Sequence, residues 1–125
     1  MAVIGAGGML GNRIVAELAL QGVRVAAHDR GAIARSKMEL DGALADAMRV
    51  ATDAVGAEGG AALGAYAGDA KALVSWHGSI AEAVREASLV IEAVVDDTLI
   101  KAEVSGRAVA VPVPVLLLLL LMLLP

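Results

Sequence analysis

A glycine-rich segment near the start of the chain has the composition of a loop that holds a phosphate group. It reads Gly5-Ala6-Gly7-Gly8-Met9-Leu10-Gly11 and directly follows the apolar residues 2–4. Glycines permit a tight turn, and they let the backbone N–H groups at the start of a helix approach a pyrophosphate. The segment therefore predicts a dinucleotide-binding loop, against the alternative of a glycine turn without a ligand. The candidate contacts are Gly5, Gly7, Gly8, Met9, Leu10 and Gly11.

A carboxylate follows the next apolar segment of the chain. Asp29 stands where a second strand, predicted over residues 23–27, would end. A carboxylate in this place accepts hydrogen bonds from the adenosine ribose hydroxyls and repels a 2′-phosphate. Asp29 therefore predicts NAD rather than NADP as the cofactor, although the neighbouring Arg30 would attract a phosphate.

The spacing of the apolar residues predicts the elements that position this loop. Residues 2–4 predict a buried strand, and the apolar positions from Asn12 onward predict a helix that Gly22 closes. Residues 23–27 predict a second strand, which runs into Asp29. Strand, glycine turn, helix, strand and acidic residue together make one βαβ unit.

The chain continues with further helical and strand patterns. Residues 32–55 predict a long amphipathic helix, because their apolar positions keep to helical steps. Residues 56–68 hold five glycines and predict either a flexible connection or a poorly ordered second helix. We expect a third strand over 72–76, a helix over 80–87 and a buried parallel strand over 88–95. This order predicts an α/β fold with a Rossmann-type doubly wound parallel sheet, which is incomplete.

Composition and charge exclude several classes of function. The formal net charge is −4 with ten scattered basic residues, which argues against a nucleic-acid surface. There is no cysteine, and two isolated histidines do not make a zinc site, so no metal is expected. Met1 is followed by an apolar strand rather than a leader peptide, which favours a cytoplasmic location.

The end of the chain has a different character. We expect residues 1–104 to form one domain and residues 105–125 to form a leucine-rich tail of uncertain origin. The unbroken apolar run 115–124 has ten residues, whereas a membrane-spanning helix needs about 20. A membrane partner is therefore not expected. One hypothesis is that the tail is translated intron, and another is that its leucines form a helix or strand that covers the open edge of the sheet.

The spacing of the glycines fits two families of dehydrogenase. It reads G-x-G-x-x-x-G through Gly5, Gly7 and Gly11, or G-x-x-G-x-x-G through Gly5, Gly8 and Gly11. The second spacing resembles that of the extended short-chain dehydrogenases that act on nucleotide sugars. Members of that class need a Tyr-x-x-x-Lys pair, but Tyr66 is followed five positions later by Lys71.

A later segment resembles a different family. Residues 79–101, SIAEAVREASLVIEAVVDDTLIK, resemble the 3-hydroxyacyl-CoA dehydrogenases, in which a short helix precedes a V-I-E-A-V strand, an acidic pair and a lysine. The segment Ala34-Arg35-Ser36-Lys37 also suits this family. The resemblance covers about residues 2–104 and implies that Asp96 and Lys101 lie beside the NAD cofactor. From the residues alone, Asp96 equally predicts a cap for a helix beginning near Thr98.

The resemblance implies an oxidoreductase of fatty acid metabolism whose chemistry is not complete in this chain. Its relatives use a serine and a histidine–glutamate pair that lie beyond the matching region. His28 and His77 are expected to be surface or edge residues, so we name no catalytic residue. We expect NAD to be a partner of this chain and acyl-CoA to bind only a full-length relative. The remaining alternatives are a short-chain-type nucleotide-sugar enzyme fragment, a small non-enzymatic membrane-associated protein, and a fragment that does not fold stably.

Overall fold

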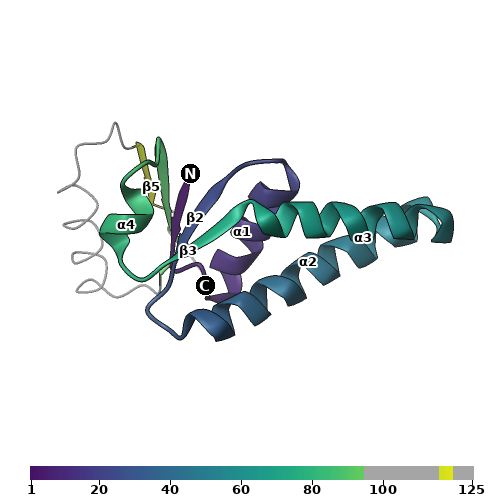
Figure 1. Cartoon of the computed structure of the whole chain (residues 1–125), viewed down its shortest axis with the longest axis horizontal. Coiled ribbons are helices and arrows are strands. Elements are labelled where there is room, and N and C mark those ends of the chain that lie inside the picture. The colour runs from purple at the N-terminus through teal and green to yellow at the C-terminus, as the bar shows by residue number, and fades with distance from the viewer. Residues whose placement is uncertain (95–115, 120–125) are drawn as a thin grey trace, which may run out of the picture.

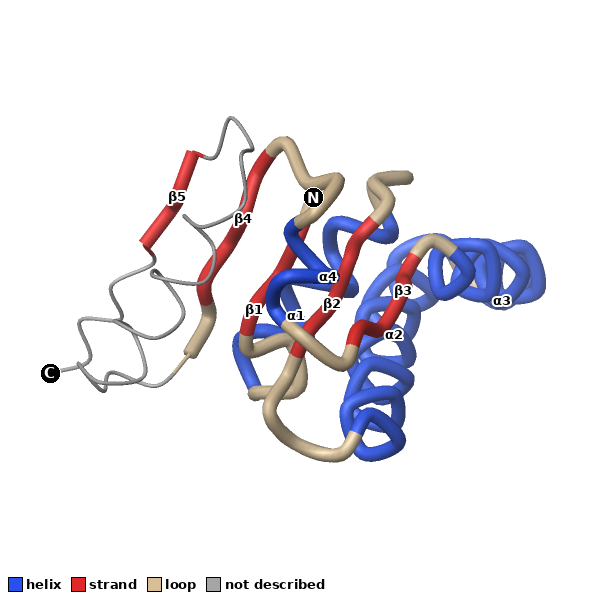
Figure 2. The backbone as a smooth tube through the Cα atoms, turned by 60° about the vertical axis from the view of Figure 1, so that its left-hand side comes forward, coloured by secondary structure: helices blue, strands red, loops and turns tan. Residues whose placement is uncertain are grey.

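The sheet of this chain is built from short parallel strands. The computed structural model describes residues 1–94 and 116–119, and the strands within these ranges are β1 (Ala2–Ile4), β2 (Val25–His28), β3 (Val74–His77), β4 (Leu89–Glu92) and β5 (Leu116–Leu119). They lie in the order β3-β2-β1-β4-β5, as Figure 2 shows. This is the order of a doubly wound sheet and confirms the predicted Rossmann-type α/β fold.

The strand order changes direction at β1. Its neighbours are β2 on one side and β4 on the other, so that Val3 lies opposite both Ala27 and Ile91. In sheets of this kind, ligands bind outside the carboxyl ends of the strands at the point where the order reverses. The segment that follows β1 therefore lies at the place where this fold positions a site.

Helices cover both faces of the sheet. Their bounds are α1 (Met9–Leu20), α2 (Ile33–Val55), α3 (Ala57–Ala72) and α4 (Ile80–Val84). Successive side chains of a strand point to opposite faces. Val3 accordingly packs with the cluster under α1, α2 and α3, whereas Ile4 packs with α4. In Figure 1, α2 and α3 lie side by side and extend away from the sheet.

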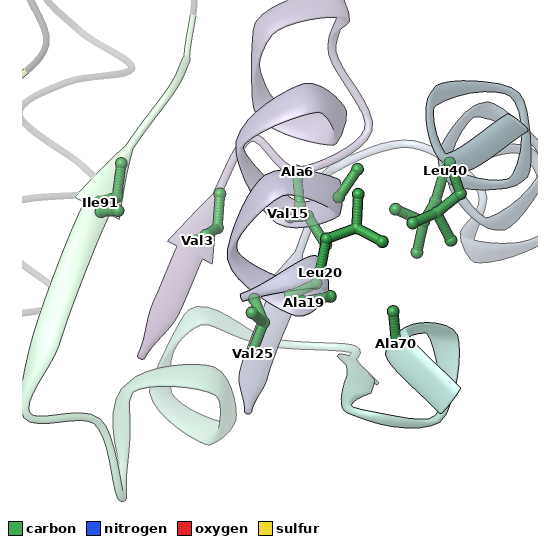
Figure 3. Packing of buried hydrophobic residues seen from close by; sticks show 12 residues of the cluster. Val3, Ala6, Val15, Ala19, Leu20, Val25, Leu40, Ala70 and Ile91 are labelled. Carbon is green, nitrogen blue, oxygen red and sulfur yellow. The ribbon is translucent and has the colours of Figure 1, made fainter. Parts of the chain in front are cut away.

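The larger core joins the sheet to three helices. Val15 of α1, Leu40 of α2 and Ala70 of α3 are all buried in one cluster with Val3 and Val25 (Figure 3). The side chains are small and aliphatic because the chain contains no Phe and only one Trp. That tryptophan, Trp76, is half-buried and packs against the cluster.

The glycine-rich stretch that follows α2 is helical. Gly56 has a φ of 78°, which turns the chain between α2 and α3, and its N–H donates to the carbonyl oxygen of Thr52. The Nζ atom of Lys71 lies 2.6 Å from Asp41 Oδ1, which ties α3 to α2. The hydroxyl group of Tyr66 donates to the carbonyl oxygen of Leu20 and ties α3 to α1. The second of the two predictions for residues 56–68, a helix, is therefore the one observed.

Some bounds differ from those predicted. The first helix begins at Met9 rather than Asn12, because Gly8 is its N-cap and Met9, Leu10 and Gly11 of the predicted loop form its first turn. The helix predicted over 80–87 ends at Val84, and the third strand begins two residues later than expected, at Val74. None of these shifts changes the order of the elements.

Four residues of the leucine-rich tail take part in the sheet. β5 pairs with β4 in parallel, with Leu116 opposite Leu89 and Leu119 opposite Glu92. This is the strand alternative among the expectations for the tail. The division of the chain at residue 104 stays a prediction. No helix among residues 1–94 and 116–119 is both long and apolar enough to cross a membrane.

Candidate functional site

The glycine loop is anchored to the end of β2. The N–H groups of Gly5 and Ala6 both donate to the carbonyl oxygen of His28, at 2.9 and 3.0 Å. Gly5 has a φ of 81°, a left-handed conformation that side chains disfavour. A Cβ on Gly5 would also lie 2.7 Å from the carbonyl oxygen of Ala93, just beyond β4. The loop is therefore fixed between the ends of β2 and β4.

The start of α1 presents free backbone N–H groups, and its first turn has no acidic side chain. Gly8 caps the helix without a side chain, and the first turn contains no acidic residue. The N–H groups of Met9, Leu10 and Gly11 have no acceptor within the helix, because the first turn lacks preceding carbonyl groups. Met9 is 75% exposed. This end of the helix carries a partial positive charge and suits a bound anion.

Asp29 lies next to the glycine loop. It directly follows β2 and is half-buried, and its Oδ2 atom accepts a hydrogen bond of 2.8 Å from the Gly31 N–H. A Cβ built on Gly7 would lie 2.8 Å from both Cγ and Oδ2 of Asp29. The structure thus brings together the carboxylate and the loop that the sequence singled out separately.

Ser36 is a third member of this group; the sequence placed it in the segment Ala34-Arg35-Ser36-Lys37 but gave it no role in the site. It lies in the first turns of α2, the residue is 2% exposed, and its Oγ atom would overlap a Cβ on Gly7. Its place beside Gly7 depends on how α2 packs, so no local pattern could have revealed it. The site therefore includes a hydroxyl group as well as the carboxylate.

The contacts of the two histidines join or follow neighbouring strands of the sheet. His28 was expected to be a surface or edge residue, but it is buried, with Nδ1 3.0 Å from the carbonyl oxygen of His77. The expectation for His28 was wrong because the end of β2 is covered by the loop and by β3. His77 is half-buried and is the last residue of β3, an edge strand of the described sheet, and its Nε2 lies 2.9 Å from Ser75 Oγ.

Two predicted site residues lie outside the described part of the chain. Asp96 and Lys101 fall within residues 95–115, so their place beside the loop stays a prediction. Within the described ranges, no group of three His, Asp or Glu side chains gathers as metal ligands.

Several solved structures share this fold. The (S)-3-hydroxybutyryl-CoA dehydrogenase PaaH1 of Ralstonia eutropha superposes with a TM-score of 0.74 at 20% identity, over 93% of this chain and 38% of its own. FadB2 of M. tuberculosis gives a TM-score of 0.66 at 24% identity, over 86% of this chain and 34% of its own. The dehydrogenase part of multifunctional enzyme 1 from C. elegans gives 0.70 at 18% identity, over 93% and 24%. This chain thus spans well under half the length of each relative.

The sequence itself matches one family. A comparison with curated proteins finds no significant match. The sequence model of the 3-hydroxyacyl-CoA dehydrogenase NAD-binding domain matches residues 1–118 and so includes most of β5. This match decides between the two families that the glycine spacing left open. The loop and the carboxylate described above fit NAD. The glycines, which have no room for a Cβ, lie at the start of a helix that suits the pyrophosphate, and next to an acid that suits the ribose. The chain belongs to the 3-hydroxyacyl-CoA dehydrogenase family, of which it contains the NAD-binding domain.

Proposed function

We propose that this chain holds NAD through the loop Gly5–Gly11 and Asp29, as the cofactor-binding part of an enzyme that oxidises 3-hydroxyacyl-CoA or a related hydroxy acid. The observation that carries the proposal is the position of the Asp29 carboxylate against Gly7, at the start of α1. The helix start suits the pyrophosphate of an adenosine diphosphate group, and the neighbouring carboxylate suits its ribose.

The loop supplies the contacts to the pyrophosphate. The first-turn N–H groups of Met9, Leu10 and Gly11 donate to its oxygens, and Gly7 and Gly8 carry no side chain that would cover this end of the helix. The partial positive charge of the helix start adds an attraction that salt weakens. Met9 contributes through its backbone, since its side chain is 75% exposed.

Asp29 selects the cofactor at the adenosine ribose. Its Oδ2 atom already accepts from Gly31, which fixes the plane of the carboxylate and leaves further lone pairs for the ribose hydroxyls. A 2′-phosphate would bring a second negative charge to the same place. Asp29 therefore favours NAD over NADP.

In the proposed enzyme, the reaction also needs a base for the substrate hydroxyl and contacts to acyl-CoA. NAD, when bound, accepts a hydride from the carbon that bears the substrate hydroxyl. We propose that the base for this reaction and most of the acyl-CoA contacts belong to the remaining part of a longer protein. Asp96 and Lys101 belong to the proposal as residues beside the cofactor, with a helix cap at Asp96 as the alternative. A cytoplasmic location is likewise proposed, and cell fractionation would test it.

Calorimetric titration of NAD and NADP into the whole chain tests the proposal. We expect saturable binding of NAD, weaker binding of NADP, and a loss of about 10- to 100-fold in NAD affinity for Asp29→Ala, because a charged acceptor is removed. Asp53→Ala is the matched control, since Asp53 is an exposed acid of α2. A folded chain that binds no NAD, or that loses equal affinity in both variants, would contradict the assignment.

A further inference from the structure

Ser36 and Asp29 meet at one point of the glycine loop although they come from different elements. A Cβ built on Gly7 would overlap Ser36 Oγ and would lie 2.8 Å from Asp29 Oδ2. The hydroxyl and the carboxylate thus converge on the place where a Gly7 side chain would otherwise be. Only a residue without a side chain at position 7 allows both groups to be there.

The helix of Ser36 holds its hydroxyl group weakly. Ser36 Oγ lies 3.5 Å from the carbonyl oxygen of Ala32, at the limit of a hydrogen bond. The same carbonyl oxygen already accepts the Ser36 backbone N–H at 3.1 Å. Thr52 makes the corresponding bond within α2 at 2.9 Å, from Oγ1 to the carbonyl oxygen of Met48. The Ser36 hydroxyl is therefore poorly satisfied by α2, although its residue is 2% exposed.

A buried hydroxyl group gains free energy when it finds a good acceptor, and a carboxylate is a stronger acceptor than a carbonyl group. The acceptor nearest the convergence point is Asp29. A rotation of the hydroxyl hydrogen about the Cβ–Oγ bond turns it away from Ala32 and toward this carboxylate. Asp29 would then be held from two sides, by the Gly31 N–H at Oδ2 and by Ser36 from α2.

We infer that Ser36 is a positioning residue of the NAD site, which orients the Asp29 carboxylate for the adenosine ribose; this inference rests on the proposed function. An acceptor held in one orientation loses less freedom when the ligand binds, and so binds it more tightly. Ser36 acts through Asp29 and does not itself contact the pyrophosphate.

A double-mutant cycle on the whole chain tests this inference, with NAD titration as the measurement. Ser36→Ala is expected to weaken NAD binding about tenfold in the otherwise unchanged chain. In the Asp29→Ala background the same change is expected to have no further effect, because the group through which Ser36 acts is missing. A merely structural role would weaken binding equally in both backgrounds.

Thr52→Val is the matched control, because it removes a hydroxyl with the same type of bond from the same helix. We expect it to leave NAD affinity unchanged. Thermal unfolding of each variant separates lost binding from lost folding. If Ser36→Ala does not fold, Ser36→Cys retains the size with a weaker donor and is expected to bind NAD less tightly than the unchanged chain.

The titrations distinguish a failure of the inference about Ser36 from a failure of the proposed NAD binding. NAD affinity within twofold for Ser36→Ala, together with a large loss for Asp29→Ala, overturns the inference and leaves the function. Equal losses from Ser36→Ala in both backgrounds also overturn it. A folded chain that binds no NAD overturns both.

Discussion

The α-carbon of Gly11 lies against the carbonyl group of Gly5, with no room for a side chain between them. A Cβ built on Gly11 would lie 2.8 Å from the carbonyl carbon of Gly5 and 2.9 Å from the α-carbon of Ala6. These are backbone atoms of a loop that is fixed to β2 and β4, so they cannot turn aside. The close approach of Gly11 to Gly5 sets the position of α1 relative to the loop.

Gly11→Ala is accordingly expected to destabilise the fold. The added methyl group forces α1 away from the loop, and overpacking of this kind costs about 1–3 kcal/mol. Urea unfolding of the whole chain measures the effect, and NAD titration of the variant is expected to show weaker binding. A free energy of unfolding equal to that of the unchanged chain would contradict the packing described here.

Gly42→Ala is expected to have the opposite effect. Gly42 lies within α2, and a Cβ there would meet no atom within 4 Å. Alanine stabilises a helix interior by about 1 kcal/mol relative to glycine, because the unfolded chain loses less freedom. The same urea experiment is expected to give a higher free energy of unfolding than for the unchanged chain. Destabilisation by Gly42→Ala would indicate that another chain or segment packs against this face of α2.

The sequence predicted the order of the elements because each has its own periodic pattern. β1 is observed over the predicted residues 2–4, and β4 lies within the predicted range 88–95. The pattern could not decide the structure of residues 56–68, because glycines lower helix propensity there. The helix is formed nevertheless, with Ala70 buried in the core and Lys71 paired with Asp41. Packing in the folded chain thus outweighs local propensity.

The site was predicted in part. The glycine loop and Asp29 could be recognised, since each occupies a fixed place relative to a strand. The contacts of Ser36 and the burial of His28 could not, because both depend on residues distant in the sequence. His28 is covered where its Nδ1 meets the carbonyl group of His77, a neighbour that only the pairing of β2 with β3 brings close.

Leu40→Ala is expected to destabilise the chain by about 2–5 kcal/mol, because it leaves a cavity in the core. Leu40 of α2 is 1% exposed and belongs to the core cluster that also contains Val15 of α1. Met38→Ala on the same helix is the control, since Met38 is 73% exposed and should change stability little. Thermal unfolding of both variants distinguishes them. Equal losses would mean that α2 does not bury the face described.

Tyr66→Phe is expected to cost about 1 kcal/mol, the usual value for one hydrogen bond. The ring stays in place, but the hydroxyl that donates to the Leu20 carbonyl group is lost. That bond joins α3 to the last residue of α1, so its loss loosens the α2–α3 pair from the core. Urea unfolding gives the difference, and an unchanged midpoint would show that the bond does not contribute.

The neighbouring charges of Asp29 and Arg30 lead to a prediction about cofactor choice. Asp29 is half-buried beside the loop, whereas Arg30 is exposed and follows it directly. A 2′-phosphate carries about −1.5 to −2 charges, so Asp29 repels it and Arg30 attracts it. With both residues present, we expect the half-buried carboxylate to prevail and NAD to be preferred. Removing the carboxylate leaves the guanidinium group as the main charge at the ribose.

Asp29→Ala is therefore expected to bind NADP more tightly than the unchanged chain does, by about tenfold, while it binds NAD less tightly. Arg30→Ala alone should leave NAD affinity within about twofold, because an exposed charge at the rim contributes little. The double variant should lose the gain in NADP affinity, since no cation then faces the phosphate. Competition titrations of the two cofactors against all three variants measure these differences. If NADP affinity rises equally in Asp29→Ala with and without Arg30, relief of repulsion alone accounts for it, and Arg30 has no part in the site.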